Sequence, residues 1–191
     1  PLMALLGAIL GLIAGAAVVL VVGLGGKSLR NGADVERELG LRFAGILPDY
    51  ASVAGRRRKR GPAAPAEYMV NQPLSSFAEA LRNLRAFLLY SGGSTPQKLI
   101  AVTSAVPREG KSMTSLCLAR AMALSGARTV VVDCDLRQRG LTRLIGDAEI
   151  GLVQVVEGTA TLDEALIYDN RTGLWILPAA QGSIPYDLFT K

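Results

Sequence analysis

A short run in the middle of the chain has the residue types of a phosphate-binding loop. It reads Pro107, Arg108, Glu109, Gly110, Lys111 and Ser112. Gly110 lets the backbone approach a ligand, Lys111 can reach the β- and γ-phosphates of a nucleotide, and the Ser112 hydroxyl can bind Mg²⁺. A loop that leads into a helix N-terminus also presents free N–H groups and the positive end of the helix dipole. We therefore predict a nucleotide-binding loop at this position.

The surroundings of this loop strengthen a motif that is weak by itself. The common form G-x-x-x-x-G-K-[ST] has a first glycine that would fall at Ala105, so only Gly-Lys-Ser matches it. The apolar run 99–104 before the loop predicts a buried strand, and the pattern after the loop predicts a helix over about 112–125 that Gly126 ends. A strand followed by a loop and a helix is the context that a phosphate-binding loop requires.

Two carboxylates follow the next predicted strand, at 129–133. Asp133 and Asp135 lie on the same side of the chain as it leaves the sheet, where ligands bind in open α/β sheets. They can hold Mg²⁺ directly or through water, and one can accept a proton from an attacking hydroxyl. Two alternatives stay open. Asp133 can be a turn residue that caps the next segment, and Asp135 can form a surface ion pair with Arg137.

Further elements complete an alternating pattern. Ser76 and Glu79 have capping-box spacing and predict the start of a helix with one apolar face, ended by Gly92-Gly93. A helix at about 161–167 and a strand at 174–177 follow. Strands separated by helices predict an α/β fold with a parallel sheet flanked by helices, of the P-loop NTPase type and incomplete at the C-terminus.

Three motifs together resemble the bacterial tyrosine kinases. The loop ending Glu-Gly-Lys-Ser is similar to that family's Walker A motif, and the strand leading into Asp133-Cys134-Asp135-Leu136-Arg137 is similar to its Walker A′ motif. The helix residues Glu79, Arg82 and Arg85 match the E-x-x-R-x-x-R motif that lies at subunit interfaces of ring-shaped oligomers in that family. Ordinary i, i+3 ion pairing on a solvated face is the alternative for these three residues.

The resemblance implies a function for the whole chain. It implies binding of ATP and Mg²⁺ and phosphoryl transfer to tyrosines of neighbouring subunits, in the service of capsule or exopolysaccharide polymerisation and export. Lys111, Asp133 and Asp135 are then the expected catalytic residues, with Asp133 the first candidate for activating the acceptor hydroxyl and Asp135 supporting the metal. The expected metal ligands are Ser112, Asp133 and Asp135. The implied partners are other copies of the chain, the polysaccharide machinery and a cognate tyrosine phosphatase. The expected nucleotide contacts are Pro107, Arg108, Glu109, Gly110, Lys111, Ser112 and Met113.

The N-terminal residues predict a membrane anchor. No charged residue occurs between Leu2 and Gly26, a run longer than the roughly 20 residues that cross a bilayer as a helix. Residues 1–26 are therefore a predicted transmembrane helix. The basic residues that follow place the rest of the chain on the cytoplasmic side of a bacterial inner membrane. Gly7, Gly11 and Gly15 share one helix face, which suits helix–helix packing, although glycine is common in membrane helices.

Residues 27–75 are predicted to form a cytoplasmic juxtamembrane linker, and residues 76–191 the N-terminal part of the kinase domain. The linker holds a short helix stopped by Gly40 and a basic run at 56–60 that suits anionic lipid or a solvated loop. Nucleic acid is not an expected partner, because no aromatic residues interleave with these charges. The chain has no histidine, which excludes His-based catalysis, and its two cysteines are expected to be small buried core residues.

Two parts of the family pattern are missing. No apolar strand that ends in Asp, the expected Walker B motif, follows residue 135, and the five tyrosines are scattered rather than clustered at the C-terminus. We therefore expect a fragment that is inactive alone. Two other functions stay open: a non-catalytic ATP-sensing scaffold for polysaccharide assembly, and a membrane-associated partitioning-type ATPase. Proteins of the latter kind usually carry a second lysine near the start of the loop, which is absent here.

Overall fold

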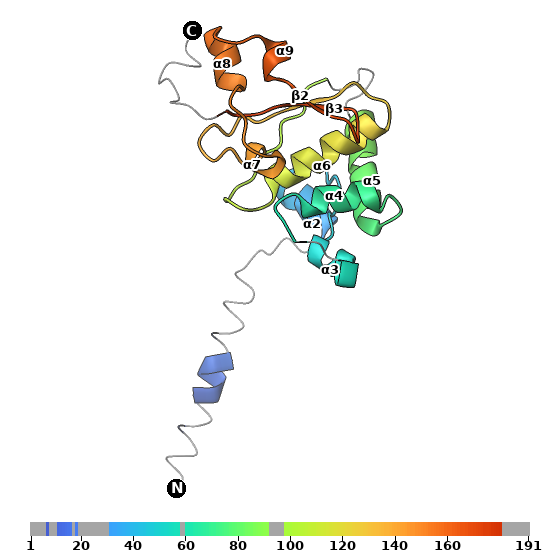
Figure 1. Cartoon of the computed structure of the whole chain (residues 1–191). Helices are drawn as coiled ribbons and strands as arrows, with labels where there is room; N and C mark the ends of the chain where they lie inside the picture. Colours follow the sequence, from blue (N-terminus) through green and yellow to red (C-terminus); the bar gives the residue numbers. More distant parts are fainter. Residues whose placement is uncertain are drawn as a thin grey trace. The chain divides into compact units, whose positions relative to one another are not determined.

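The computed structural model describes residues 7, 11–16, 18, 31–57, 60–91 and 98–180. The chain divides into two compact units, residues 1–43 and residues 44–191 (Figure 1). Most of the predicted membrane span lies outside the described residues. Its glycines Gly7, Gly11 and Gly15 are described and helical, and a Cβ at any of them would meet no atom within 4 Å. Among the helices that the structure describes, none has the length and hydropathy needed to cross a bilayer.

The first unit contains the short helix predicted before Gly40. Helix α2 spans Gly32–Leu39; the Asn31 side chain caps it by accepting from Asp34 N at 2.8 Å. Gly40 ends the helix with φ +66°, a left-handed conformation that glycine adopts without strain. The prediction of this helix and of its glycine stop is confirmed.

The second unit holds the remaining elements. Its elements are α3 (Tyr50–Ala54), η1 (Gly55–Arg57), α4 (Ala64–Asn71), α5 (Ser76–Ser91), α6 (Lys111–Leu124), β1 (Val130–Val132), α7 (Thr142–Ile145), α8 (Leu152–Glu157), α9 (Leu162–Ala165), β2 (Ile167–Asp169) and β3 (Leu174–Leu177). The helix after the loop and the strands at 130–132 and 174–177 confirm the sequence prediction, within a few residues at their ends.

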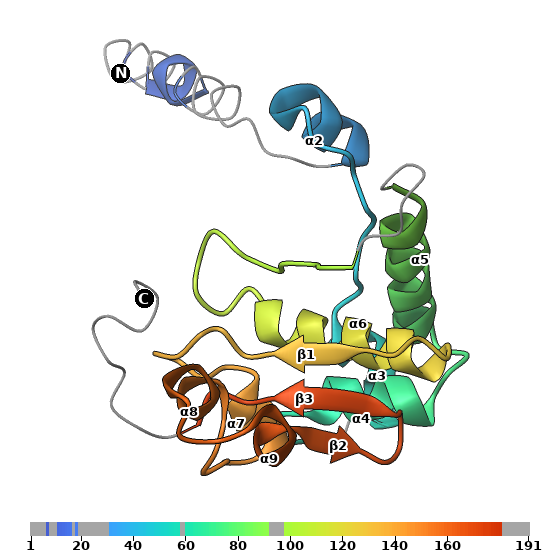
Figure 2. The same ribbon diagram turned by 90° about the horizontal axis from the view of Figure 1, so that it is seen from above.

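The sheet is mixed rather than parallel. Its order is β1-β3-β2, with β1 parallel to β3 and β2 antiparallel to β3 (Figure 2). Strand β2 was not predicted. Its residues lie at the end of the helix predicted over 161–167, but that helix, capped by Thr161 and Glu164, ends at Ala165. A four-residue turn then folds β2 back onto β3 as an antiparallel pair, which needs no crossover helix.

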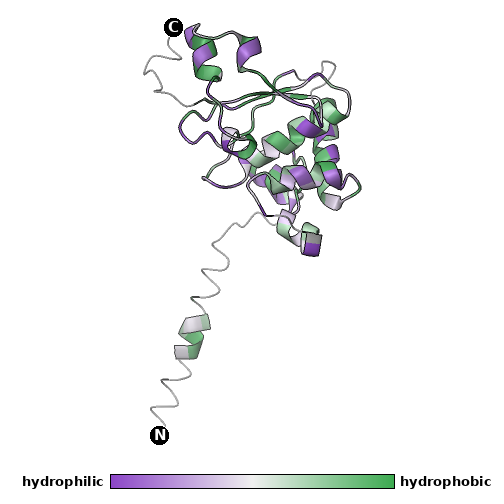
Figure 3. Ribbon diagram, in the orientation of Figure 1, coloured by the Kyte–Doolittle hydropathy of each residue, from purple (hydrophilic) through white to green (hydrophobic). Residues whose placement is uncertain are grey.

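Helix α6 lies in the centre of the unit. One side of it packs on β1 and β3 and the other on α4 and α5, and residues 116–120 are all buried. A helix with no exposed stripe over five residues belongs to the interior of a fold. Figure 3 shows hydrophobic residues along the strands and on this helix. The core around it includes Leu81, Leu116, Leu174 and Ile176, each at most 2% exposed.

The predicted strand at 99–104 is not a strand in the structure. Leu99 is 89% exposed and Val102 is 37% exposed, and no strand pairing includes them. A strand forms only where a neighbour accepts its backbone hydrogen bonds. Within the described residues β1 pairs with β3 alone, and residues 99–104 do not pair with its free edge, so this run has no partner strand.

Part of the predicted linker is structured. Helices α3 and α4 lie inside residues 44–191, and Ala64, Ala66 and Met69 of α4 are buried. Pro65 occupies the first helical turn, a position where its missing N–H costs nothing. The glycine, prolines and alanines of 61–65 predict a linker, because glycine and proline break helices. Here Pro65 instead begins a helix, which proline also favours.

The helix that carries the E-x-x-R-x-x-R residues begins as predicted but has a different cap. Ser75, not Ser76, is the capping residue: its hydroxyl accepts from Ala78 N at 3.2 Å and donates to Gln72 O at 2.7 Å. The predicted Ser76–Glu79 capping box is therefore wrong. One consequence is that the Glu79 carboxylate is not used in the cap.

A buried ion cluster ties α4 and α6 to the β2–β3 turn. Arg120 on α6 is 8% exposed and donates to Glu67 and Asp169, each at 3.0 Å. Arg171 also donates to Glu67, and to Asn71 at 2.8 Å. This cluster joins residues up to about a hundred positions apart, so it fixes α4 to α6 and to the turn between β2 and β3.

The cluster predicts a dependence of stability on acid. Partial burial raises the pKa of the Glu67 carboxyl, but the hydrogen bonds and charges of Arg120 and Arg171 lower it more, so it lies below the ordinary value. A lowered folded pKa adds stability that is present above the unfolded pKa and lost as pH falls through the folded one. We expect Glu67→Gln to flatten the loss of stability below about pH 4.5, measured by urea unfolding at several pH values. Glu149→Gln, at an exposed site, is the control and should leave the wild-type slope; equal slopes for all three proteins would contradict the prediction.

Candidate functional site

Two residues of the loop before α6 have positive φ angles, which most residue types adopt only with strain. Gly110 is the cap of α6 and has φ +87°, and a Cβ there would have no atom within 4 Å. Arg108 has φ +70°, which is uncommon for a residue with a side chain. The Glu109 carboxylate folds back and accepts from Val106 N at 3.1 Å. The loop is therefore held in a tight turn with open space at its glycine.

The N-terminus of α6 offers several backbone donors. Its first hydrogen bond within the helix runs from Thr114 N to Gly110 O at 2.8 Å. In the part of the chain that the structure describes, no acceptor is assigned to the N–H groups of residues 110–113. Free N–H groups at a helix start, together with the helix dipole, form an anion-binding site. The phosphate-binding loop prediction is consistent with this geometry.

The structure brings the two predicted motifs together. The Lys111 ammonium lies 3.5 Å from the Asp135 carboxylate, and both side chains are about a third exposed, at 33% and 27%. Among the described residues, the ion pair to Asp135 thus comes from Lys111 and not from Arg137. The loop after β1 therefore faces the loop before α6.

A second contact between the motifs involves Gly140. A Cβ built on Gly140 would lie 2.5 Å from the Ser112 hydroxyl oxygen, so the backbone of Gly140 rests directly against that side chain. This contact was not predicted from the sequence, because a lone glycine after the A′ motif reads as an ordinary turn residue. The Gly140 backbone therefore lies against the hydroxyl that is expected to bind Mg²⁺.

Asp133 is buried and fully engaged. It is 4% exposed; one carboxylate oxygen accepts from the Thr142 N–H and hydroxyl at 2.8 Å each, and the other accepts from Asp135 N at 3.1 Å. Thr142 Oγ1 in turn accepts from Ala179 N at 2.8 Å. The bond to Asp135 N is the local contact expected of a turn residue. Asp133 thus fixes the loop that carries Asp135. The Asp135 carboxylate is 27% exposed; one oxygen accepts from Gln138 N at 3.0 Å and the other lies beside Lys111.

Thr142 is the residue of this region that the sequence did not reveal. It is completely buried, at 0% exposure, and links β1, α7 and the segment after β3. A threonine between Leu141 and Arg143 has no spacing relation to the motifs, so no pattern could single it out.

The two cysteines differ from each other. Cys117 on α6 is buried, and burial raises the pKa of its thiol to about 12. Cys134, between the two aspartates, is exposed, so the prediction of a buried core residue is wrong there. Burial alternates through this stretch, with Val131 and Asp133 buried and Val132 exposed, so Cys134 lies on the exposed side.

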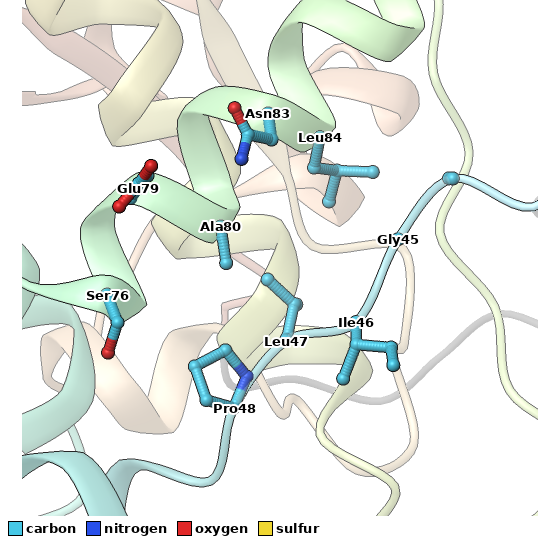
Figure 4. A pocket seen from close by; sticks show the side chains of 10 residues that line it. Gly45, Ile46, Leu47, Pro48, Ser76, Glu79, Ala80, Asn83 and Leu84 are labelled. Carbon is cyan, nitrogen blue, oxygen red and sulfur yellow. The ribbon is translucent and has the colours of Figure 1, made fainter. Parts of the chain in front are cut away.

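The three residues of the predicted oligomer interface lie on α5, away from the phosphate-binding loop. Glu79 lines a groove of about 350 Å³ between α5 and the segment 44–48, with Ala80, Asn83 and Leu84 from the same helix (Figure 4). Arg82 donates to Pro73 O at 2.6 Å. The structure shows no ion pair among Glu79, Arg82 and Arg85, all of which it describes, so the i, i+3 pairing alternative does not hold.

The residues present fit Mg²⁺ bound with a nucleotide. No group of three or more His, Cys, Asp or Glu side chains among the described residues could hold a metal ion. Magnesium in nucleotide sites is bound by one or two protein groups together with phosphate oxygens and water. Ser112 and the partly exposed carboxylate of Asp135 match that smaller set, and a nucleotide would supply the remaining oxygens.

Sequence comparison matches the loop region to P-loop ATPases. Residues 98–155 match the family "ATPase MipZ". The septum site-determining protein MinD of Escherichia coli (strain K12) is 41% identical over 88 residues, which are 44% of this chain and 33% of that protein. These matches cover the two facing motifs but less than half of the chain.

Other relatives match nearly the whole chain. The succinoglycan biosynthesis transport protein ExoP of Rhizobium meliloti (strain 1021) is 30% identical over 93% of this chain and 25% of that protein. The putative tyrosine-protein kinase EpsB of Ralstonia solanacearum is 29% identical over 98% of this chain and 24% of that protein. The chain thus spans about a quarter of the length of these relatives.

The fold agrees with a solved kinase domain. The kinase domain of the Escherichia coli tyrosine kinase ETK superposes with a TM-score of 0.67 and 26% identity, over 80% of this chain and 60% of that domain. The α/β P-loop fold is therefore confirmed, apart from the antiparallel β2. The resemblance that the motifs predict is confirmed as well: this chain is similar to the bacterial tyrosine kinase domains of proteins of exopolysaccharide biosynthesis.

Proposed function

We propose that this chain binds ATP with Mg²⁺ through residues 107–113 and forms the nucleotide-binding part of a protein tyrosine kinase. The observation that carries this proposal is the 3.5 Å contact between Lys111 and Asp135, which sets the two motifs face to face. The unused N–H groups at the start of α6 lie on the same loop. Together they form a cradle for a chain of phosphates with an acidic group opposite.

The proposed roles follow from exposure and from hydrogen bonding. Lys111 neutralises charge on the β- and γ-phosphates, and Ser112 binds Mg²⁺. Asp135, with 27% of its side chain exposed, is accessible to the metal and to an incoming tyrosine hydroxyl. Asp133 is the second candidate for accepting the hydroxyl proton; its oxygens would first have to exchange a bond to Thr142 or to Asp135 N. We therefore assign Asp133 mainly to positioning.

The cellular setting is proposed from the same resemblance. Residues 1–26 would anchor the chain in a bacterial inner membrane with the rest cytoplasmic. Copies would associate through the membrane helix and through Glu79, Arg82 and Arg85, and the kinase would regulate capsule or exopolysaccharide polymerisation and export. A cognate tyrosine phosphatase would reverse the modification.

Nucleotide binding and the fate of the phosphate test this proposal. Titration calorimetry with ATP, with and without Mg²⁺, should show binding that Mg²⁺ strengthens. Incubation with ATP should then be followed by immunodetection of phosphotyrosine and by assay of inorganic phosphate. Phosphotyrosine formation supports the kinase, and binding with neither product supports the ATP-sensing scaffold. A chain that is folded by circular dichroism and still binds no ATP would refute the proposal altogether.

A partitioning-type ATPase is the second candidate, because residues 98–155 match the MipZ family. Such an enzyme would release inorganic phosphate without labelling tyrosine. The same two assays therefore separate it from the kinase. The near-complete coverage by ExoP and EpsB favours the kinase, since the ATPase matches cover less than half of the chain.

The contact between Gly140 and Ser112 gives a prediction for this site. Gly140→Ala places a methyl group 2.5 Å from the Ser112 hydroxyl oxygen, which must rotate away from its position. If Mg²⁺·ATP needs the original position, binding carries an overpacking penalty of about 1–3 kcal/mol, or roughly 5- to 150-fold in affinity. Calorimetric titration measures this loss.

A double-mutant cycle provides the control. Ser112→Ala removes the obstructing oxygen, so Gly140→Ala should cause no further loss in that background. Stability should change little, because the obstacle is the end of a rotatable side chain. If the two substitutions weaken binding additively, the contact does not act through Ser112.

A further inference from the structure

Arg139 occupies a position that the predicted motifs do not explain. It lies in the loop between β1 and α7 and has φ +49°, a left-handed conformation that is uncommon for arginine. Its N–H donates to Asp135 O at 2.6 Å, and its carbonyl accepts from Arg143 N at 2.9 Å. The backbone of Arg139 is therefore held on both sides, four residues after Asp135, which pairs with Lys111.

This backbone lies at the phosphate-binding loop. The next residue is Gly140, whose absent Cβ would lie 2.5 Å from the Ser112 hydroxyl. Arg139 is thus one residue from direct contact with Ser112 and is bonded to the backbone of Asp135. Both neighbours belong to the proposed Mg²⁺·ATP site.

One nitrogen of the Arg139 guanidinium is unsatisfied. Nη1 is buried and has no hydrogen-bond partner among the described residues. A buried charged donor without an acceptor is costly, and such groups in native proteins call for an explanation. The two nearest acidic motif residues are engaged elsewhere: Asp133 by Thr142 and the N–H of Asp135, and Asp135 by Lys111.

We propose that Arg139 donates from its guanidinium to a phosphate oxygen of the bound nucleotide, as a second cation beside Lys111. The inference rests on the proposed function and adds to it a phosphate-binding residue outside the predicted motifs. An arginine fork matches the geometry of phosphate oxygens and forms strong charge-assisted bonds with them. The same anion would satisfy both the N–H groups of residues 110–113 and the unpartnered guanidinium nitrogen.

Affinity measurements on charge-neutral variants test the inference. Arg139→Asn removes the charge and suits the left-handed backbone, and Arg139→Gln keeps more of the length and serves if the first variant unfolds. Each should weaken Mg²⁺·ATP binding at least about tenfold in calorimetric titrations, the effect of one lost charge-assisted bond. Inorganic tripolyphosphate, used as a competitor, should lose affinity to a similar degree, because the contact is to phosphate.

A matched control separates this inference from general electrostatics and from the proposed function. Arg143→Gln removes the same charge four residues later, at an exposed site, and should change affinity less than about twofold at 0.15 M salt. Wild-type binding retained by a folded Arg139 variant, or an equal loss in Arg143→Gln, overturns the role of Arg139 and leaves the proposed function standing. A loss for ATP but not for tripolyphosphate also overturns it. Absence of ATP binding by the folded wild-type chain overturns the proposed function itself.

Discussion

Replacing Arg120 with methionine is expected to lower the free energy of unfolding by about 3–5 kcal/mol, the usual effect of breaking a buried ion pair by removing one partner. The Arg120 side chain is 9% exposed and its partner Asp169 is 11% exposed, so the carboxylate left behind has little access to water. Asp169 would keep its bonds to Thr172 Oγ1 and Arg171 N but would lose its buried countercharge. Urea unfolding followed by circular dichroism measures the change.

Two variants separate the buried charge from lost packing. Arg171→Met removes a cation of the same cluster whose side chain is 47% exposed, and should cost less than about 1 kcal/mol. Adding Asp169→Asn to Arg120→Met removes the stranded charge and should restore part of the stability. An Arg120→Met protein that is no less stable than Arg171→Met would show that the cluster does not hold α4 and α6 together.

Elements with their own local signals were predicted from the sequence. Helix α2 has a capping asparagine and a terminal glycine, and α6 lies between Gly110 and Gly126, so their bounds follow from backbone chemistry alone. Strand β3 is a short apolar run of the right length. In these places local preference and tertiary packing agree, and such agreement makes an element predictable.

Elements decided by tertiary pairing were not predicted correctly. Residues 99–102 are apolar like β1, but a strand also needs a hydrogen-bonded partner strand, and none of the described strands pairs with them. Ile167–Asp169 comes directly after a capped helix, and the local sequence does not mark where the helix ends. Pairing with β3 makes these residues a strand. Helix α4 becomes visible only when Ala66 and Met69 are seen buried against α5 and α6.

For the candidate site, too, some residues could be predicted from the sequence and others could not. The sequence located Lys111 and the aspartate pair, because nucleotide chemistry needs those residue types in that order. Alternation placed both aspartates on one side, and the family resemblance made Asp133 the first candidate for activating the acceptor hydroxyl, with Asp135 supporting the metal. The structure distinguishes them through Thr142, which occupies Asp133 and leaves Asp135 facing Lys111. Long-range contacts of this kind, like that of Gly140 with Ser112, have no signature in spacing.

Replacing Lys111 with methionine is expected to weaken ATP binding by about 10- to 100-fold. A charge-assisted hydrogen bond to phosphate contributes about 1.5–3 kcal/mol, and methionine keeps the apolar stem of lysine but has no donor. Lys111 and Asp135 are both about a third exposed, so losing their ion pair should change stability by less than about 1 kcal/mol. Binding and folding can therefore be separated in this variant by titration calorimetry and thermal unfolding.

The control must carry the same change of net charge. Lys98→Met removes one positive charge at an exposed position before the loop and should bind ATP like the wild type. If both variants lose affinity equally, Lys111 acts only through the general attraction between the basic chain and the nucleotide, which added salt would abolish. If only Lys111→Met loses affinity and salt leaves most of the difference, the ammonium acts by direct contact. In that case Asp135, freed from Lys111 when phosphate takes its place, becomes available to the metal.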